Sequence, residues 1–252
     1  MKIFYPEGDF ERVCERYSDP AAFLELMDEN GVDYTVVLAE LSPETTGIAT
    51  NEEVLEFCSR SPKLIPFCNV NPGLSKEPGR ELRRWAEEGF RGLKLYPTYQ
   101  HFYPNDRALY PMYEAAQELR MPVLFHTGTS VFRGSKIKYG EPLHLDDLAV
   151  DFPDLPLVMA HSGRTMWYEQ AFTLARLHPN LYMEISGLPP KNLLNYFPAL
   201  ERNAGKIIFG SDWPGMPGVK RNLDEIRSLP LKGSTISGIL GGTAARLLGL
   251  PE

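Results

Sequence analysis

The stretch Met121-Pro122-Val123-Leu124-Phe125-His126 carries no polar side chain until it reaches a histidine. Two later segments have the same form: 157–160 is followed by His161, and 207–211 by Asp212. Apolar runs of this length, bounded by turn residues, are typical of fully buried strands in a parallel sheet. The pattern predicts buried parallel strands that each end on a residue able to bind a metal or move a proton.

Strands of this kind alternate with helices along the whole chain. We expect seven strands, at 34–39, 64–70, 91–96, 121–125, 156–160, 181–186 and 206–211, with helices between them, including one at 192–203. Such alternation implies a parallel sheet with right-handed crossovers. The length of 252 residues is near that of one (β/α)8 barrel. A Rossmann sheet is the structural competitor, but its Gly-x-Gly-x-x-Gly turn follows no early strand.

An eighth strand is harder to find. Ile3-Phe4-Tyr5 is the only candidate before the first expected helix, which Ser18 or Asp19 caps. Either this short segment is the first strand, or the true first strand lies upstream of Met1. We therefore expect a single domain over residues 1–252, a distorted (β/α)8 TIM barrel whose first strand is short or missing.

The strand ends give the main clue to function. In a parallel barrel all carboxyl ends of strands open onto one face, and catalysis takes place there. His126, His161 and Asp212 are therefore expected to converge, although they are far apart in sequence. The alternative is that these three residues are structural and only form hydrogen bonds, with Asp212 capping a turn before Pro214.

Composition excludes several other classes of protein. The net charge is −7, and the sequence has no cluster of Lys and Arg of the kind that binds nucleic acid. No apolar stretch approaches the roughly 20 residues that cross a bilayer. The three cysteines lack metal-site or redox spacing, which is typical of reduced thiols. We expect a cytoplasmic protein.

Four segments match a known family in their order and spacing. They are Gly89-Phe-Arg-Gly-Leu-Lys-Leu95, Pro122-Val-Leu-Phe-His-Thr-Gly128, the stretch 152–163 ending in Ala-His161-Ser-Gly163, and Ile207-Ile-Phe-Gly-Ser-Asp-Trp-Pro214. Together they resemble the amidohydrolase-2 (amidohydrolase-related) group of the amidohydrolase superfamily. That group includes aminocarboxymuconate-semialdehyde decarboxylase and resorcylate-type decarboxylases. The likeness extends from about Asp19 to Leu250.

The resemblance implies a divalent metal, most readily Zn²⁺, with Mn²⁺ as the alternative. His126 matches a metal ligand, His161 matches a histidine that binds metal or polarises the substrate, and Asp212 matches a ligand that also shuttles a proton. The family's first strand normally ends in His-x-His or Glu-x-His, and nothing of that form occurs before His101. The remaining three residues could just supply the three protein ligands of a catalytic zinc.

Basic and aromatic residues near these positions predict the kind of substrate. Arg133, in the long loop after His126, and Arg164 suit a carboxylate, which Arg grips with two parallel hydrogen bonds. Trp213 is a candidate wall for an aromatic group, and Lys94 ends its strand near the same rim. The alternatives are a solvated loop for Arg133, core packing for Trp213, and an ion pair for Lys94.

Three functions remain open from the sequence. We expect first a metal-dependent hydrolase of a small carboxylate-bearing molecule, in which Asp212 accepts a proton from metal-bound water. The alternative is a non-oxidative decarboxylase of an aromatic or unsaturated carboxylic acid. The third is a catalytically degenerate barrel that acts as a binding protein. A homodimer is compatible with each, and no nucleic acid or membrane partner is expected.

Overall fold

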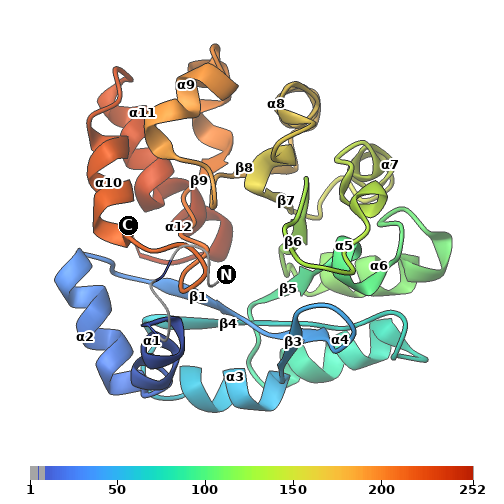
Figure 1. Cartoon of the computed structure of the whole chain (residues 1–252). Coiled ribbons are helices and arrows are strands. Elements are labelled where there is room, and N and C mark those ends of the chain that lie inside the picture. The colour runs from blue at the N-terminus through green and yellow to red at the C-terminus, as the bar shows by residue number, and fades with distance from the viewer. Residues whose placement is uncertain (1–4, 6–8, 252) are drawn as a thin grey trace.

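A computed structural model describes residues 5 and 9–251 and shows a curled parallel sheet surrounded by helices (Figure 1). All seven predicted strands are confirmed. In spatial order they are β1 (Thr35–Leu38), β4 (Leu64–Cys68), β5 (Gly92–Leu95), β6 (Val123–His126), β7 (Leu157–Ala160), β8 (Leu181–Glu184) and β9 (Ile207–Ile208). Every neighbouring pair is parallel. This is the arrangement of a distorted (β/α)8 barrel.

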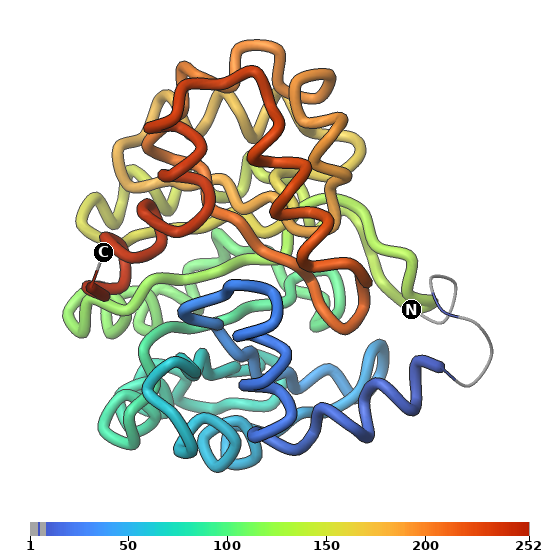
Figure 2. Tube along the Cα trace, turned by 90° about the vertical axis from the view of Figure 1, so that its left-hand side faces the viewer, coloured from blue at the N-terminus to red at the C-terminus, as the bar shows by residue number. Residues whose placement is uncertain are grey.

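Helices connect the strands and cover the outside of the sheet. They are α1 (Asp9–Tyr17), α2 (Pro20–Asn30), α3 (Asn51–Cys58), α4 (Pro78–Glu87), α5 (Pro97–Gln100), α6 (Tyr110–Glu118), α7 (His144–Asp151), α8 (Tyr168–Leu177), α9 (Leu193–Tyr196), α10 (Val219–Arg227), α11 (Gly233–Ser237) and α12 (Thr243–Leu248). Figure 2 shows the N-terminal and C-terminal thirds of the chain on opposite sides, with the middle third between them. Within the described ranges, no helix has the length and apolar character that crossing a membrane requires.

The described strands do not close the barrel. β1 and β9 are the outer strands, and neither pairs with a further strand among the residues that the structure describes. The predicted first strand, Ile3-Phe4-Tyr5, lies largely outside those residues, so it stays a prediction. Tyr5 itself is described, and its hydroxyl donates to the carbonyl oxygen of Pro214 at 2.7 Å, in the loop after β9.

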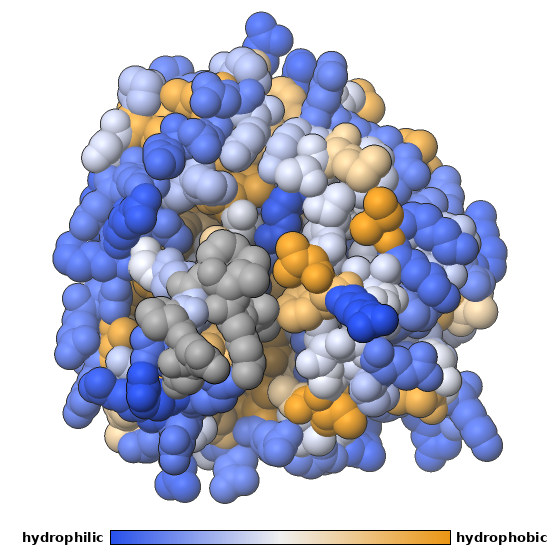
Figure 3. Space-filling view, in the orientation of Figure 1, coloured by the Kyte–Doolittle hydropathy of each residue, from blue (hydrophilic) through white to orange (hydrophobic). Residues whose placement is uncertain are grey.

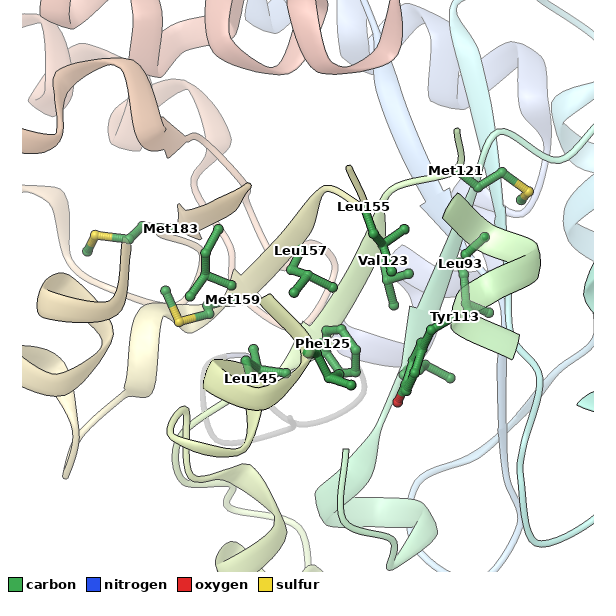
Figure 4. Packing of buried hydrophobic residues seen from close by; sticks show 14 of the residues in the cluster. Leu93, Tyr113, Met121, Val123, Phe125, Leu145, Leu155, Leu157, Met159 and Met183 are labelled. Atoms are coloured by element: carbon green, nitrogen blue, oxygen red, sulfur yellow. The ribbon is translucent and has the colours of Figure 1, made fainter. Parts of the chain in front are cut away.

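Both faces of the central strands are covered, which explains why their sequences are continuously apolar. One set of alternating residues, including Val123, Phe125, Leu157 and Met159, is fully buried and packs toward the helices (Figure 4). The other set points into the barrel interior. Because side chains alternate along a strand, Lys94 and His126 fall in this interior set, next to the active face.

Most strands are one or two residues shorter than predicted, and two predicted elements differ more. The helix predicted at 192–203 is broken into α9 and 3₁₀ turns at 190–192 and 200–206. Pro198 explains the break, because a proline removes a backbone donor and disfavours helix in the residue before it. The strand predicted at 206–211 reduces to the two residues of β9.

Two elements near the N-terminus were not predicted. α1 precedes the first expected helix, and an antiparallel hairpin, β2 (Glu40–Ser42) with β3 (Gly47–Ala49), follows β1. Asp19 does cap α2, by accepting a hydrogen bond from the Ala21 amide, and the capping box of Thr50 and Glu53 starts α3.

The burial of β7 gives a direct test of the fold. Replacing Leu157, which is fully buried, with Ala should lower the free energy of unfolding by about 2–5 kcal/mol, because a cavity is left next to β6. Leu177→Ala is the matched control, since that side chain is 67% exposed and should cost within about 0.5 kcal/mol. Urea unfolding followed by circular dichroism measures both. Equal losses in the two variants would contradict the placement of β7.

Candidate active site

A large cavity runs through the barrel interior and includes the carboxyl ends of the strands in its lining. Its volume is about 1910 Å³, and its lining includes Lys94 from β5, His126 from β6 and Glu184 from β8. His161 and Asp212, which follow β7 and β9, also line it. The cavity therefore collects the polar ends of five strands. On the face seen in Figure 3, hydrophilic side chains form the periphery and apolar ones are visible toward the middle.

His126 and His161 lie side by side, as predicted. Their ring centroids are 4.8 Å apart, with the rings inclined by 67°. The strand register causes this proximity, because His126 pairs with Ala160, the residue before His161. Burial lowers the pKa of both imidazoles well below the ordinary value. The neighbouring His161 lowers the pKa of His126 further, and Arg164 lowers that of His161. Both rings are thus neutral at neutral pH.

Hydrogen bonds lock these two strand ends together. The hydroxyl of Thr127 donates to the Ala160 carbonyl at 2.7 Å and accepts from the Gly163 amide at 3.1 Å. Gly128 continues this close approach, since a Cβ there would lie 2.0 Å from the carbonyl oxygen of Arg164. The two imidazoles are therefore held on a rigid support rather than on flexible loops.

Glu184 is a site residue that the sequence reasoning missed. It is buried, and its carboxylate accepts from the His161 amide at 3.2 Å, the Ser186 amide at 2.7 Å and the Ser186 hydroxyl at 2.8 Å. Burial raises its pKa to about 7, against the lowering effect of these hydrogen bonds. Glu184 ends β8 as His126 ends β6, but the strand predicted at 181–186 placed it inside the strand, which concealed it.

Asp212 reaches the same cavity from the open side of the sheet. Its backbone has a left-handed φ of 56°, and its side chain is exposed to solvent in the cavity. The surrounding protein nevertheless raises its pKa by desolvation, while Arg164 and Lys94 oppose that rise.

The three predicted metal ligands do not form a compact group. Among residues 5 and 9–251, no three His, Cys, Asp or Glu side chains are arranged to hold a metal ion. The two imidazoles are adjacent, and Nε2 of His126 is buried without a hydrogen-bond partner, as an atom awaiting a ligand would be. Asp212 does not complete the set, since it follows the two-residue strand β9 at the unpaired edge of the sheet.

Two cations also line the cavity. Lys94 is 3% exposed, and its ammonium lies 4.6 Å from the centre of the Tyr96 ring. Burial lowers its pKa to about 8, although Glu184, Asp212 and Glu40 act in the opposite direction. None of these carboxylates forms an ion pair with it within the described ranges, so the pairing considered for Lys94 is absent there.

Arg164 follows His161 and lines the cavity as predicted. Its guanidinium donates to the Thr129 carbonyl at 3.3 Å and packs over Gly187, where a Cβ would lie 2.2 Å from the guanidinium. No ion pair with Arg164 occurs in the described part of the chain. The guanidinium therefore keeps donors available for a ligand.

The other two predicted substrate contacts have different outcomes. Arg133 is exposed and lies outside the cavity lining. Backbone hydrogen bonds from Gly128 to Gly140 and from Lys136 to Thr98 fold this loop, and its residue Phe132 lines the cavity while Arg133 does not. Trp213 lines the cavity and also packs against aromatic rings of α1 and α2, so both interpretations of it apply.

The order and chemistry of these strand ends agree with a sequence comparison. The profile of the amidohydrolase family matches residues 3–250, nearly the whole chain. The chain belongs to the amidohydrolase-2 family. No match was found among curated proteins.

Several solved structures are similar to this amidohydrolase-2 protein. A TIM-barrel protein of Bordetella bronchiseptica shares 25% identity with a TM-score of 0.78, covering 91% of this chain and 82% of that one. A dihydroxybenzoic acid decarboxylase of Polaromonas sp. JS666, holding manganese and 2-nitroresorcinol, shares 20% with a TM-score of 0.73, covering 98% and 91%. A probable 2-pyrone-4,6-dicarboxylic acid hydrolase of Acinetobacter baumannii, with citric acid bound, shares 17% with a TM-score of 0.67, covering 92% and 89%. Other similar structures are decarboxylases of 5-carboxyvanillate and 2,6-dihydroxybenzoate.

The incomplete ligand set predicts weak metal binding. With only two adjacent imidazoles in place, added Zn²⁺ or Mn²⁺ should bind and then be lost on dialysis, since a catalytic zinc usually has three protein ligands. Elemental analysis before and after dialysis measures this. His126→Ala should abolish the dialysable metal, while His178→Ala, whose ring pairs with Asp146, should retain it. Stoichiometric metal that survives dialysis would contradict this arrangement.

Proposed function

We propose that the protein catalyses the non-oxidative decarboxylation of an aromatic or unsaturated carboxylic acid. The observation that carries this proposal is the pair of cations, Lys94 and Arg164, that line the same cavity as His126 and His161 without an ion pair in the described structure. The hydrolase that the sequence placed first becomes the second candidate, because most of the named relatives are decarboxylases.

The two cations account for binding of the carboxylate. A buried cation without a partner is costly, and an entering carboxylate would relieve that cost through charge-assisted hydrogen bonds. Arg164 offers a planar fork of donors, and Lys94 offers a point charge from the neighbouring side of the cavity. Arg133 plays no part in this proposal, since it stands outside the cavity.

Aromatic side chains account for the planar part of the substrate. Tyr99 lies 4.7 Å from the ring of His126 and stacks on Tyr96 at 5.7 Å. Phe132 packs edge-on against Tyr99 from the loop after β6, and Trp213 also lines the cavity. Flat ligands gain from such walls through stacking and edge-to-face contacts, which favours an aromatic or conjugated acid.

The reaction needs one proton delivered to carbon. The bond between the carboxylate and its carbon breaks, CO₂ leaves, and a proton from the protein takes its place on that carbon. Asp212 is the candidate donor, because its carboxyl group lines the cavity and desolvation there raises its pKa. His161 is neutral, so at neutral pH it orients the substrate or accepts a proton rather than donating one.

A divalent metal belongs to the proposal as a cofactor. A relative holds manganese, and His126 and His161 would give such an ion two nitrogen ligands, with Zn²⁺ as the other candidate. Imidazole is a suitable ligand for either class of ion only when its nitrogen is unprotonated, and burial keeps both rings in that form.

Hydrolysis is the second candidate because one similar structure is a probable hydrolase of a dicarboxylic acid. In that case Asp212 would act first as a base toward water and afterwards as an acid. The cations would serve the same purpose, since that substrate also carries carboxylates.

A substrate panel separates these functions. The purified protein, with Mn²⁺ or Zn²⁺ added, is incubated with hydroxybenzoates and with 2-pyrone-4,6-dicarboxylate, and CO₂ release and ring opening are measured. We expect CO₂ from a hydroxybenzoate, and Asp212→Asn should lower kcat by about 100-fold or more with little change in KM. Asp146→Asn, outside the cavity lining, is the matched control. Ring opening without CO₂ would establish the hydrolase, and binding without either reaction would establish a binding protein.

The buried lysine predicts a pH dependence of ligand binding. The pKa of Lys94 is about 8, so its ammonium is present below that pH and lost as the pH rises through it. The affinity for an aromatic carboxylate should therefore fall by about tenfold between pH 7 and pH 9. In Lys94→Arg the charge persists and the fall should disappear, while titration of Glu184 is common to both proteins. Calorimetric titration measures this, and identical pH profiles would exclude Lys94 as the anchor.

A further inference from the structure

We propose that Ser186 and Glu184 are positioning residues that fix the tautomer of His161 and direct its Nε2 lone pair into the cavity. This inference deepens the proposed function, on which the role of His161 rests. Its physical basis is a continuous chain of hydrogen bonds that starts at one nitrogen of the imidazole and ends on a buried carboxylate.

The first link decides which nitrogen carries the hydrogen. Nδ1 of His161 lies 3.0 Å from the backbone oxygen of Ser186. A carbonyl oxygen can only accept, so Nδ1 must donate and Nε2 must carry the lone pair in the neutral ring. A neutral imidazole carries one N–H only, so Nε2 is then left unprotonated.

The second link removes an ambiguity that the serine hydroxyl would otherwise introduce. Oγ of Ser186 lies 2.9 Å from the same Nδ1 and could in principle donate to it. Oγ also lies 2.8 Å from Oε2 of Glu184, and a carboxylate accepts hydrogen bonds. When Glu184 is ionised, above its pKa of about 7, the hydroxyl hydrogen therefore goes to Glu184. The hydroxyl oxygen then shares the Nδ1 hydrogen of His161 with the Ser186 carbonyl.

Glu184 also holds the backbone of the histidine that it helps to orient. Oε2 accepts from the His161 amide at 3.2 Å, and the φ of His161 is 64°, in the left-handed region that non-glycine residues rarely adopt. Oε1 accepts from the Ser186 amide at 2.7 Å. One carboxylate thus secures both the backbone of His161 and the serine that contacts its ring.

Gly210 provides the space for this carboxylate. A Cβ at that position would lie 1.8 Å from Oε1 of Glu184 and 3.1 Å from Cβ of Ser186. The φ of Gly210 is not in the left-handed region, so backbone conformation alone does not require a glycine there. The absence of a side chain is therefore explained by the room that Glu184 occupies.

The consequence concerns the atom that meets the substrate. With Nδ1 committed to Ser186, Nε2 of His161 has no hydrogen-bond partner within residues 5 and 9–251 and faces the cavity beside His126. An unprotonated Nε2 is the form that can accept a proton or coordinate an ion. Breaking the chain should let the ring adopt the other tautomer, in which Nε2–H can do neither.

Nitrogen NMR of the imidazoles tests this without any substrate. In protein labelled with ¹⁵N-histidine, long-range ¹H–¹⁵N spectra distinguish protonated from unprotonated ring nitrogens, and His161→Gln assigns the signals. We expect His161 to be protonated on Nδ1 alone. Ser186→Ala keeps the backbone carbonyl but loses the hydroxyl oxygen that also accepts from Nδ1, and Glu184→Gln loosens that hydroxyl. In both variants part of the population should therefore shift to the Nε2–H form, and Gly210→Ala should act in the same direction by displacing the carboxylate.

A matched serine variant supplies the control. Ser59→Ala removes an exposed hydroxyl that donates to the Glu56 carbonyl, and it should leave the His161 spectrum unchanged. His161 protonated on Nε2 in the unmodified protein would overturn the proposal, whether or not the variants fold. So would a Ser186→Ala protein that keeps wild-type stability and the Nδ1–H form.

Activity gives a second readout that separates this inference from the proposed function. If a hydroxybenzoate is decarboxylated, Ser186→Ala should lower kcat by about tenfold or more and leave KM nearly unchanged, because the carboxylate anchors are intact. A tautomer change in a protein without decarboxylase activity would support the positioning chain and refute the reaction. Decarboxylation with no tautomer change in the variants would support the reaction and refute the chain.

Discussion

A parallel strand that is covered on both faces can carry a polar side chain at low cost only where it ends. This constraint places the chemistry of the molecule. Helices cover one side of β5 to β8 and the barrel interior lies on the other, so Lys94, His126 and Glu184 stand at the last interior position of their strands. The parallel register then brings these ends together, with His126 beside Ala160 and Glu184 beside Ile208. Residues that are distant in sequence become neighbours without any specialised loop.

The site divides its polar groups into two kinds. Glu184 and Nδ1 of His161 form hydrogen bonds within the protein, and these bonds hold the two side chains in place. Nε2 of His126 and the ammonium of Lys94 have no such partners in the described structure, and they face the space where a ligand would sit. Buried polar groups are normally satisfied, so unsatisfied ones gathered in one cavity indicate a function that an incoming molecule completes.

Much of this arrangement could be predicted from the sequence because it follows from short-range patterns. Apolar runs, together with the alternation of strands and helices, located all seven strands, and the residues that end those runs included both histidines. Glu184 was overlooked because the strand predicted at 181–186 placed it inside the strand, whereas β8 ends at Glu184. Other features depend on long-range structure. Arg133 lies outside the cavity lining although Phe132 is part of it, and Asp212 forms no three-residue metal group with the imidazoles. Neither could be inferred from residue types or spacing.

The central claim is that the strand ends form one carboxylate-binding site. The most direct measurement is a crystal structure of the protein with 2,6-dihydroxybenzoate. The account predicts that the carboxylate lies within hydrogen-bond distance of Arg164 or Lys94, with the ring against Tyr99 and beside His126. A ligand bound outside the cavity, or a bound ligand whose carboxylate points away from both cations, would contradict it.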